Sequence, residues 1–213
     1  MKKIGILTHH YIKNYGAFLQ GYALQETLKS IYPDDEVYII DFVNKKHDIK
    51  NTLGWFRYNP KKDSIKSYFQ KIKLPKIFKK IQKENYNLTK KVKNAKEINE
   101  LCLDAIVVGS DEVWHYEDIA NNPLKFGKGL KVKKLLSYAP STGSSDVENN
   151  IPKYVEEGLK NFTGLSARDD NAEKLIKNVL EKTPTRVLDP TLLYEFPDYN
   201  SKFVDKIKIE KYI

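Results

Sequence analysis

The first candidate for a chemical role is the segment Gly109 to His115 (GSDEVWH), which follows the apolar run Asp104 to Val108. Asp111 offers a carboxylate that can act as a general base or accept a hydrogen bond from a hydroxyl group. Ser110 can orient a sugar hydroxyl or cap a helix. Trp114 can stack on a ligand, but we interpret it as a core residue beneath the loop. The segment therefore favours acid–base chemistry on a substrate with hydroxyl groups.

A second candidate is Arg168, one of only three arginines, in the segment Ser166-Ala167-Arg168-Asp169. A guanidinium at the end of a strand can hold a carboxylate or a phosphate through two parallel hydrogen bonds. The structural alternative is an ion pair of Arg168 with Asp169 or Asp111. Of the two, we favour the anion-binding role.

The third candidate is the loop His9 to Gly16 (HHYIKNYG), between an apolar run and a helical pattern. Gly16 lets the backbone approach a ligand, and the N–H groups of the following helix favour an anion. For Asn14, Tyr15 and Gly16 the alternative is a turn followed by a helix cap. Because the loop lacks the GxGxxG fingerprint, the sequence does not favour NAD or FAD as a cofactor.

The histidines are poor candidates for a metal site. His9 and His10 are adjacent, so their side chains point in different directions, and only His47 and His115 remain as partners. We therefore expect no bound metal, and the pattern assigns no role to His9, His10 or His115.

The intervening patterns predict alternating strands and helices. The predicted strands are Lys3–Thr8, Glu36–Phe42, Asp104–Val108, Lys134–Ala139, Gly164–Ala167 and Arg186–Leu188. The predicted helices are one after Gly16, Ser64–Lys73, Lys76–Asn99, Ile151–Leu159 and Asp169–Leu180, with an irregular connection over Asn44–Asn59. A core-facing stripe is predicted from Ile77, Ile81, Leu88, Val92 and Ala95.

This order predicts an α/β fold, a Rossmann-like parallel sheet flanked by helices. We expect one domain over residues 1–193 and a linker over residues 194–213 that leads towards a second domain. Ligands of such sheets bind at the carboxyl ends of the strands, where the three segments above lie.

The composition limits the class of protein. Of the 213 residues 40% are hydrophobic, and no apolar run approaches the roughly 18 residues that a membrane span needs. The N-terminus lacks the pattern of a signal peptide, and Cys102 is the only cysteine, so no internal disulfide can form. We therefore expect a cytoplasmic protein, at most in contact with the inner face of the membrane.

The net charge of +9 suggests a polyanionic partner, but the residue types argue against nucleic acid. Nearly all basic residues are lysines, whereas nucleic-acid recognition favours arginine. Much of the charge lies between Lys61 and Lys96 on predicted helices. We interpret it as a solvated face, with a polyanion or membrane-surface site as the alternative.

Five segments, in this order along the chain, resemble the polysaccharide pyruvyl transferase family. None is specific alone, but together they span nearly all of the chain to about Leu193. They are NYGAFLQGYALQ (Asn14–Gln25), DAIVVGSDEVW (Asp104–Trp114), LLSYAPSTG (Leu135–Gly143), LSARDDNAEKL (Leu165–Leu175) and VLDPTLL (Val187–Leu193).

The resemblance implies the N-terminal domain of a GT-B fold, in which two Rossmann-like domains face each other across a cleft. It also implies transfer of the pyruvyl group of phosphoenolpyruvate to two hydroxyls of a sugar, in a surface polysaccharide or its lipid-linked precursor. A cyclic ketal forms and phosphate is released. Phosphoenolpyruvate is then a co-substrate, and no separate cofactor is implied.

Arg168 matches the Ser-x-Arg position of the family and would clamp an anion. On this resemblance we assign catalytic roles to Asp111 and Arg168. The residues assigned to substrate binding are Asn14, Tyr15, Gly16, Ser110 and Arg168.

Two departures from the family pattern matter. Glu112 and His115 stand where members usually carry Gln and Asn. The family's catalytic acid resembles a histidine in an Arg-x-His motif of the second domain, and this sequence contains no such motif. We therefore expect this chain alone to be inactive. The alternatives are a non-catalytic carbohydrate-binding or assembly module of the same fold, or one half of a GT-B glycosyltransferase.

Overall fold

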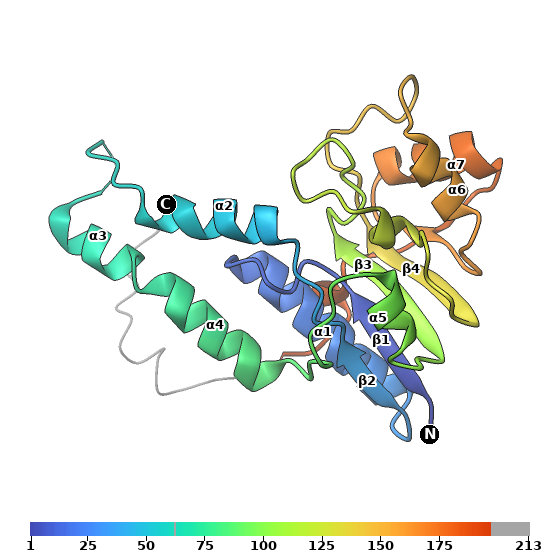
Figure 1. The fold of residues 1–213 in the computed structure, drawn as a ribbon, viewed down its shortest axis with the longest axis horizontal. Coiled ribbons are helices and arrows are strands. Elements are labelled where there is room, and N and C mark those ends of the chain that lie inside the picture. The colour runs from blue at the N-terminus through green and yellow to red at the C-terminus, as the bar shows by residue number, and fades with distance from the viewer. Residues whose placement is uncertain (62, 197–213) are drawn as a thin grey trace.

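The computed structural model describes residues 1–61 and 63–196, and its centre is a parallel sheet (Figure 1). The sheet has the strand order β2-β1-β3-β4. A short parallel pair, β5 and β6, continues it, because Leu136 of β4 bridges to Gly164, two residues before β5. The strands are β1 (Lys3–Leu7), β2 (Glu36–Ile39), β3 (Ala105–Asp111), β4 (Lys134–Pro140), β5 (Ser166–Ala167) and β6 (Thr185–Arg186).

Helices cover both faces of the sheet, so its strands are apolar on both sides. Ile6 and Val107 pack with Leu24 of α1 (Tyr15–Ile31) on one face. On the other face, Ile106 and Val108 belong to the cluster that includes residues of α6 (Lys153–Leu159) and α7 (Asp170–Leu180). The predicted α/β fold with a parallel sheet flanked by helices is confirmed.

Two side-chain caps fix where the helices begin at the carboxyl ends of the strands. Asn14 Oδ1 accepts the Ala17 N–H at 3.2 Å, and Asp169 Oδ1 accepts the Ala172 N–H at 2.9 Å. Each cap satisfies an N–H group that the first turn of a helix leaves without an intrahelical acceptor. The predicted helix starts after Gly16 and at Asp169 are confirmed to within two residues.

The predicted irregular connection over Asn44–Asn59 is wrong, because this segment forms α2 (Lys45–Phe56). Asn44 caps the helix by accepting the His47 N–H at 3.3 Å. The prediction failed because α2 contains no buried residue, so no apolar stripe of helical period faces a core.

The predicted long helix over Lys76–Asn99 is also wrong in its middle. Two helices, α4 (Leu74–Asn85) and α5 (Ala95–Asn99), are separated by extended chain. Leu88 and Val92, predicted to lie on a helical stripe, form parallel bridges with Ile39 and Phe42 beside the edge of the sheet. Ile77 of the same predicted stripe is exposed.

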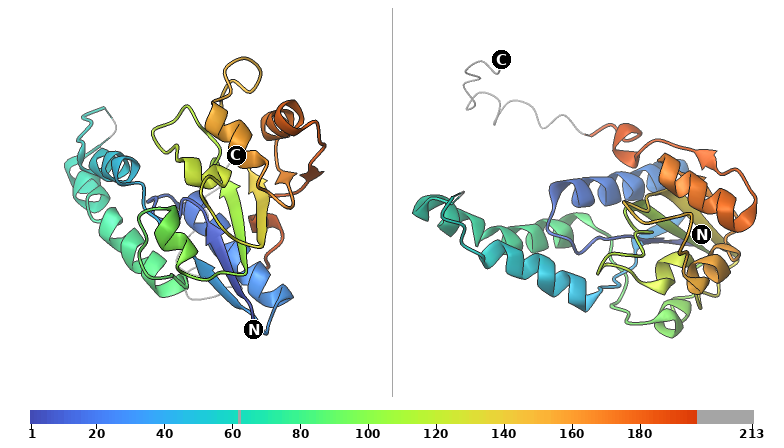
Figure 2. Two further views of the ribbon diagram at one scale, coloured as in Figure 1. Left: turned by 45° about the vertical axis from the view of Figure 1, so that its right-hand side comes forward. Right: turned by 90° about the horizontal axis from the view of Figure 1, so that it is seen from above.

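Figures 1 and 2 show α2, α3 (Ile65–Lys71) and α4 projecting together from one side of the sheet. We call residues 45–85, which comprise these helices, the helical arm. The predicted final strand is shifted, since β6 ends at Arg186. The predicted linker over 194–213 lies outside the described residues, apart from its first three. Within the described part of the chain, no helix is both long and apolar enough to cross a membrane.

Trp114 is a core residue, as predicted. Its side chain is fully buried, and its Nε1–H donates to the Lys125 carbonyl at 2.8 Å. This bond joins the segment after β3 to the short 3₁₀ helix η1 (Pro123–Phe126). A second 3₁₀ helix, η2 (Pro190–Leu192), follows β6 and packs near α1.

Candidate functional site

A cavity of about 600 Å³ opens at the carboxyl ends of β1 and β3. The chain leaves β1 towards one face of the sheet and β3 towards the other, so a crevice forms between the two connections. Parallel α/β sheets bind their ligands at this type of position. The cavity is lined by Ile12, Lys13, Asn14, Gly16, Ala17, Gln20, Asn51, Trp55, Asp111, Arg168, Asp189 and Thr191.

Arg168 lies between two carboxylates at one wall of the cavity. Its Nη1–H donates to Asp189 Oδ2 at 2.7 Å, and its Nη2 lies 3.9 Å from Asp111 Oδ1. Of the two ion pairs predicted as the structural alternative, the one with Asp111 is present, whereas Asp169 instead caps α7. Because 3.9 Å is too long for a hydrogen bond, the guanidinium keeps N–H donors for a further acceptor.

Asp111 is the last residue of β3, and its backbone has a φ of 78°. This left-handed conformation is more accessible to Asp than to most other residues. Asp111 Oδ1 accepts the N–H of Glu112 at 2.9 Å, which holds the carboxylate at the cavity wall. One carboxylate oxygen remains available to a ligand hydroxyl.

Ser110 lies beneath the cavity and is fully buried. Its hydroxyl donates to Gln20 Oε1, while Gln20 Nε2 donates to Thr8 Oγ1 at 3.2 Å. Gln20 itself lines the cavity. In this structure Ser110 therefore supports the cavity wall through Gln20.

The N-terminal turn of α1 forms the floor of the cavity. Asn14 and Gly16 both line it, and the first turn of α1 contains no acidic residue. The N-terminus of a helix attracts anions because its N–H groups and the helix dipole both point outwards. Tyr15 is not among the lining residues. Its side chain is exposed, and its ring lies 4.6 Å from that of Phe78, centroid to centroid.

The sequence did not identify the opposite wall, which comes from Lys13 and α2. The Lys13 ammonium pairs with Asp48 and donates to Thr52 Oγ1 at 2.7 Å, which anchors α2 beside the cavity. Asn51 and Trp55 of α2 then face the cavity. The spacing of Asp48, Thr52 and Trp55 places them on one side of a helix, but a polar stripe of this kind predicts no buried face.

A sequence profile described as polysaccharide pyruvyl transferase matches residues 14–212, which is nearly the whole chain. The chain belongs to the polysaccharide pyruvyl transferase family. Neither the curated proteins nor the solved structures gave a match.

Glu112 and His115, the two positions expected to depart from the family pattern, pair with each other. His115 Nδ1 lies 3.4 Å from Glu112 Oε2, and neither residue lines the cavity. His115 also packs closely against the loop around Gly143. Glu112 and His115 therefore support the loop after β3 and do not line the cavity.

A cluster of buried titratable groups lies close to Asp111 of the cavity. The Nζ of Lys125 is fully buried, 2.8 Å from His9 Nδ1, and His9 Nε2 lies 3.3 Å from the Glu112 carbonyl. Burial lowers the pKa of Lys125 to about 7, against the partial compensation of Asp111 and Asp118. Burial, reinforced by Lys125, also lowers the pKa of His9 well below its ordinary value.

The other histidines have structural partners. His10 Nε2 lies 3.3 Å from Asp41 Oδ1, and the Tyr11 hydroxyl lies 3.2 Å from His47 Nδ1. Burial lowers the pKa of His47 and raises that of Tyr11. Among the described residues, no three His, Cys, Asp or Glu side chains are grouped so that they could hold a metal ion.

Proposed function

We propose that this pyruvyl transferase family member binds phosphoenolpyruvate in the cavity between β1 and β3 and presents it to a sugar with two hydroxyl groups. In the reaction, the methylene carbon of phosphoenolpyruvate gains a proton and the adjacent carbon becomes cationic. The two sugar hydroxyls add to that carbon, lose their protons and displace phosphate. The product is a cyclic ketal of pyruvate on a surface polysaccharide or its precursor.

The observation that carries this proposal is that Arg168 and the N-terminal turn of α1 line the same cavity. Phosphoenolpyruvate has a carboxylate and a phosphate, and each needs cationic or N–H partners. The remaining guanidinium donors suit one anionic group, and the first turn of α1 beside Lys13 suits the other. A cavity of about 600 Å³ also leaves room for part of a sugar ring.

The carboxylates of the cavity suit the acceptor. We propose that Asp111 accepts the proton of an attacking hydroxyl, since Asp111 lines the cavity and only its Oδ1 is occupied, by the Glu112 N–H and by the approach of Arg168. Trp55 and Asn51 on the wall from α2 offer an aromatic face and an amide to the sugar. Asp189 holds the guanidinium in place and is a positioning residue.

The lining of the cavity bears on the proton donor. We propose that the acid that protonates the methylene carbon is not among the residues that line the cavity, none of which is a histidine. A non-catalytic module that binds a carbohydrate is the second candidate, and the aromatic face of Trp55 beside the Asn51 amide favours it. The two differ in whether the cavity takes phosphoenolpyruvate.

Replacement of Arg168 by alanine is expected to weaken phosphoenolpyruvate binding by about ten- to a hundredfold. The loss is that of charge-assisted hydrogen bonds, on the order of 1.5–3 kcal/mol, and Asp189 is left to repel the anion. Isothermal titration calorimetry on the wild type and the variant measures this. Arg168→Lys should recover only part of the affinity, because an ammonium cannot form two parallel hydrogen bonds.

Arg186→Ala is the matched control. Arg186 is an exposed arginine that pairs with Asp170 and Glu173 on α7 and does not line the cavity. Its removal should leave phosphoenolpyruvate binding unchanged. If the wild type does not bind phosphoenolpyruvate but binds oligosaccharides, the carbohydrate-binding module is the correct function.

A further inference from the structure

The positive charge of the protein is concentrated in the helical arm. Residues 45–85 contain 13 Lys and Arg residues and 3 Asp and Glu residues, a net formal charge of +10. The whole chain carries +9, so the remainder is almost neutral. Because this charge lies on one projecting element, the positive field is local to the helical arm and is not spread over the whole surface.

The helical arm also exposes apolar side chains between its lysines. Ile49, Leu53 and Phe56 of α2 follow at intervals of four and three residues, and Ile65 and Phe69 of α3 are four apart. These five side chains, which we call the arm stripes, are between 48% and 73% exposed. Such spacing places the members of each stripe on one side of their helix.

Lysines flank the arm stripes directly. Lys46, Lys50 and Lys66 each lie three residues before a stripe residue and are exposed. On a helix surface, residues three apart are neighbours, so Ile49, Leu53 and Phe69 each have a lysine beside them. Helices that lie in a membrane interface have this combination of exposed aliphatic or aromatic groups and lysines.

A second copy of the chain is a poor occupant of this surface. Two arms in contact would bring two charges of +10 together, and lysine is depleted in the cores of protein interfaces. Nucleic acid is also a poor match, because 12 of the 13 basic residues are lysines and the arm stripes contain aliphatic groups. An anionic lipid surface satisfies both the charge and the apolar groups.

We propose that the helical arm docks the protein on a membrane that contains anionic lipids, with the arm stripes inserted at the interface. The sequence alone favoured a solvated face for these lysines, and the exposure of the apolar groups between them is the additional observation. Docking would place the cavity close to the lipid, because Asn51 and Trp55, on another side of α2, form part of the cavity wall. That consequence for a lipid-linked acceptor rests on the proposed function, but the docking itself does not.

The test is co-sedimentation of the protein with vesicles of phosphatidylcholine alone and of phosphatidylcholine mixed with phosphatidylglycerol. We expect at least tenfold tighter binding to the anionic vesicles, weakened by added salt. Lys50→Glu with Lys66→Glu, and separately Leu53→Ser with Phe69→Ser, should each reduce that binding on the order of tenfold or more. These four side chains are exposed, and circular dichroism checks that the variants fold.

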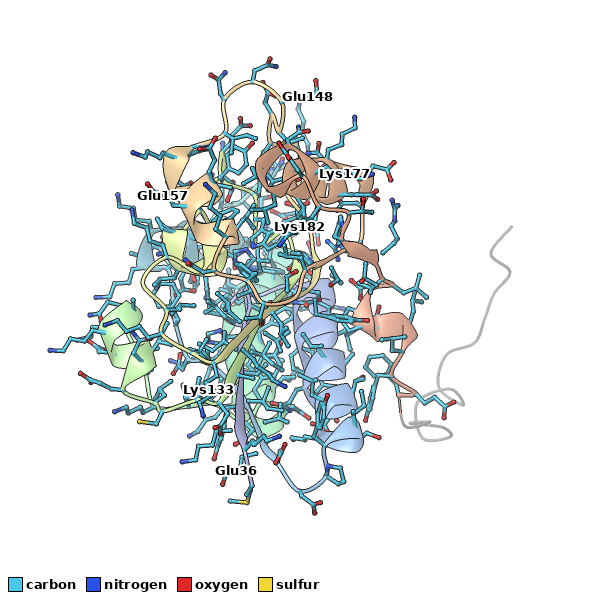
Figure 3. The ribbon with its side chains drawn as sticks, turned by 90° about the vertical axis from the view of Figure 1, so that its right-hand side faces the viewer. Glu36, Lys133, Glu148, Glu157, Lys177 and Lys182 are labelled. Atoms are coloured by element: carbon cyan, nitrogen blue, oxygen red, sulfur yellow. The ribbon has the colours of Figure 1, made fainter. Side chains whose placement is uncertain are left out.

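Lys133→Glu with Lys182→Glu is the matched control for charge. Figure 3 shows both exposed lysines on the side of the molecule opposite the helical arm, and this pair makes the same change in net charge. Its binding to anionic vesicles should stay within about twofold of the wild type.

The proposal is overturned if the wild type does not prefer anionic vesicles, if the arm variants bind normally, or if the control loses as much. Binding of duplex DNA without binding of vesicles would also overturn it. The assay contains no phosphoenolpyruvate, so its outcome is independent of the proposed function.

Discussion

Lys125→Met is expected to raise the free energy of unfolding at neutral pH, by on the order of 2–4 kcal/mol. Lys125 is fully buried, and its ammonium must leave water without a directly bonded carboxylate. Methionine has a similar length and volume and needs no hydrogen-bond partner. The Lys125 carbonyl, which accepts the Trp114 Nε1–H, is retained in the variant.

The sign of the pH dependence follows from the lowered pKa of Lys125. Its pKa is about 7 in the folded protein against the ordinary value of 10.5, so between these pH values the unfolded chain binds more protons. The free energy of unfolding of the wild type should therefore rise with pH, by on the order of 2 kcal/mol between about pH 7 and about pH 9. Lys125→Met should remove most of this rise.

Urea denaturation at several pH values measures both effects. The range stops at about pH 9 because buried tyrosines such as Tyr11, whose pKa is raised, ionise earlier in the unfolded chain and reverse the slope above that pH. Lys128→Met is the control, since Lys128 is exposed and lies in the same segment. If Lys125→Met and Lys128→Met have the same stability and the same slope, Lys125 is not a strained buried cation.

Asp111 and Arg168 could be predicted from the sequence as partners in a site because each follows a strand of a parallel sheet. Parallel strands end at the same edge, so two polar segments far apart in the sequence meet without any further information. The helix caps at Asn14 and Asp169 could also be predicted from the sequence, since an Asn or Asp before a helical pattern favours a cap with a known hydrogen bond.

The wall from α2 could not be predicted for a physical reason. Periodicity detects a helix through the apolar face that it buries, and α2 has no buried residue. Lys13 holds α2 through Asp48 and Thr52, which are contacts between polar groups 35 and 39 residues away in the sequence. Nothing in the local pattern encodes such a pairing, so Trp55 was interpreted as part of a loop.

The side-chain partners of Arg168 and Lys125 are the other feature that the sequence did not predict. Asp189 pairs with Arg168 across 21 residues, and Lys125 contacts His9 across 116. Both involve long side chains that reach across the ends of strands, where small differences in backbone position decide which partner is met. The sequence predicted Asp169 or Asp111 as an ion-pair partner of Arg168, and the pair with Asp111 is present, but it did not identify Asp189, which accepts the hydrogen bond.

Gly109→Ala is expected to cost on the order of 3 kcal/mol or more of unfolding free energy. Gly109 lies in β3 with a φ of 130°, a conformation that residues with a Cβ rarely adopt. An added Cβ would also overlap the Tyr138 carbonyl of the neighbouring strand β4, which is backbone and cannot rotate away. The substitution must therefore separate β3 from β4 or turn the peptide, and either change displaces Asp111 two residues later. Thermal unfolding measures the first effect, and calorimetry with phosphoenolpyruvate measures the second.

Gly54→Ala provides a control of opposite sign. Gly54 lies within α2, and a Cβ added there would meet no atom within 4 Å. Alanine in the interior of a helix is more favourable than glycine by about 0.5–1 kcal/mol, so this variant should be slightly more stable than the wild type. The two substitutions add the same methyl group, so the difference between them shows that the cost at Gly109 comes from its backbone conformation and its contact with β4 and not from the methyl group itself. If Gly109→Ala folds with wild-type stability and still binds phosphoenolpyruvate, then close packing of β3 against β4 does not hold Asp111 at the cavity.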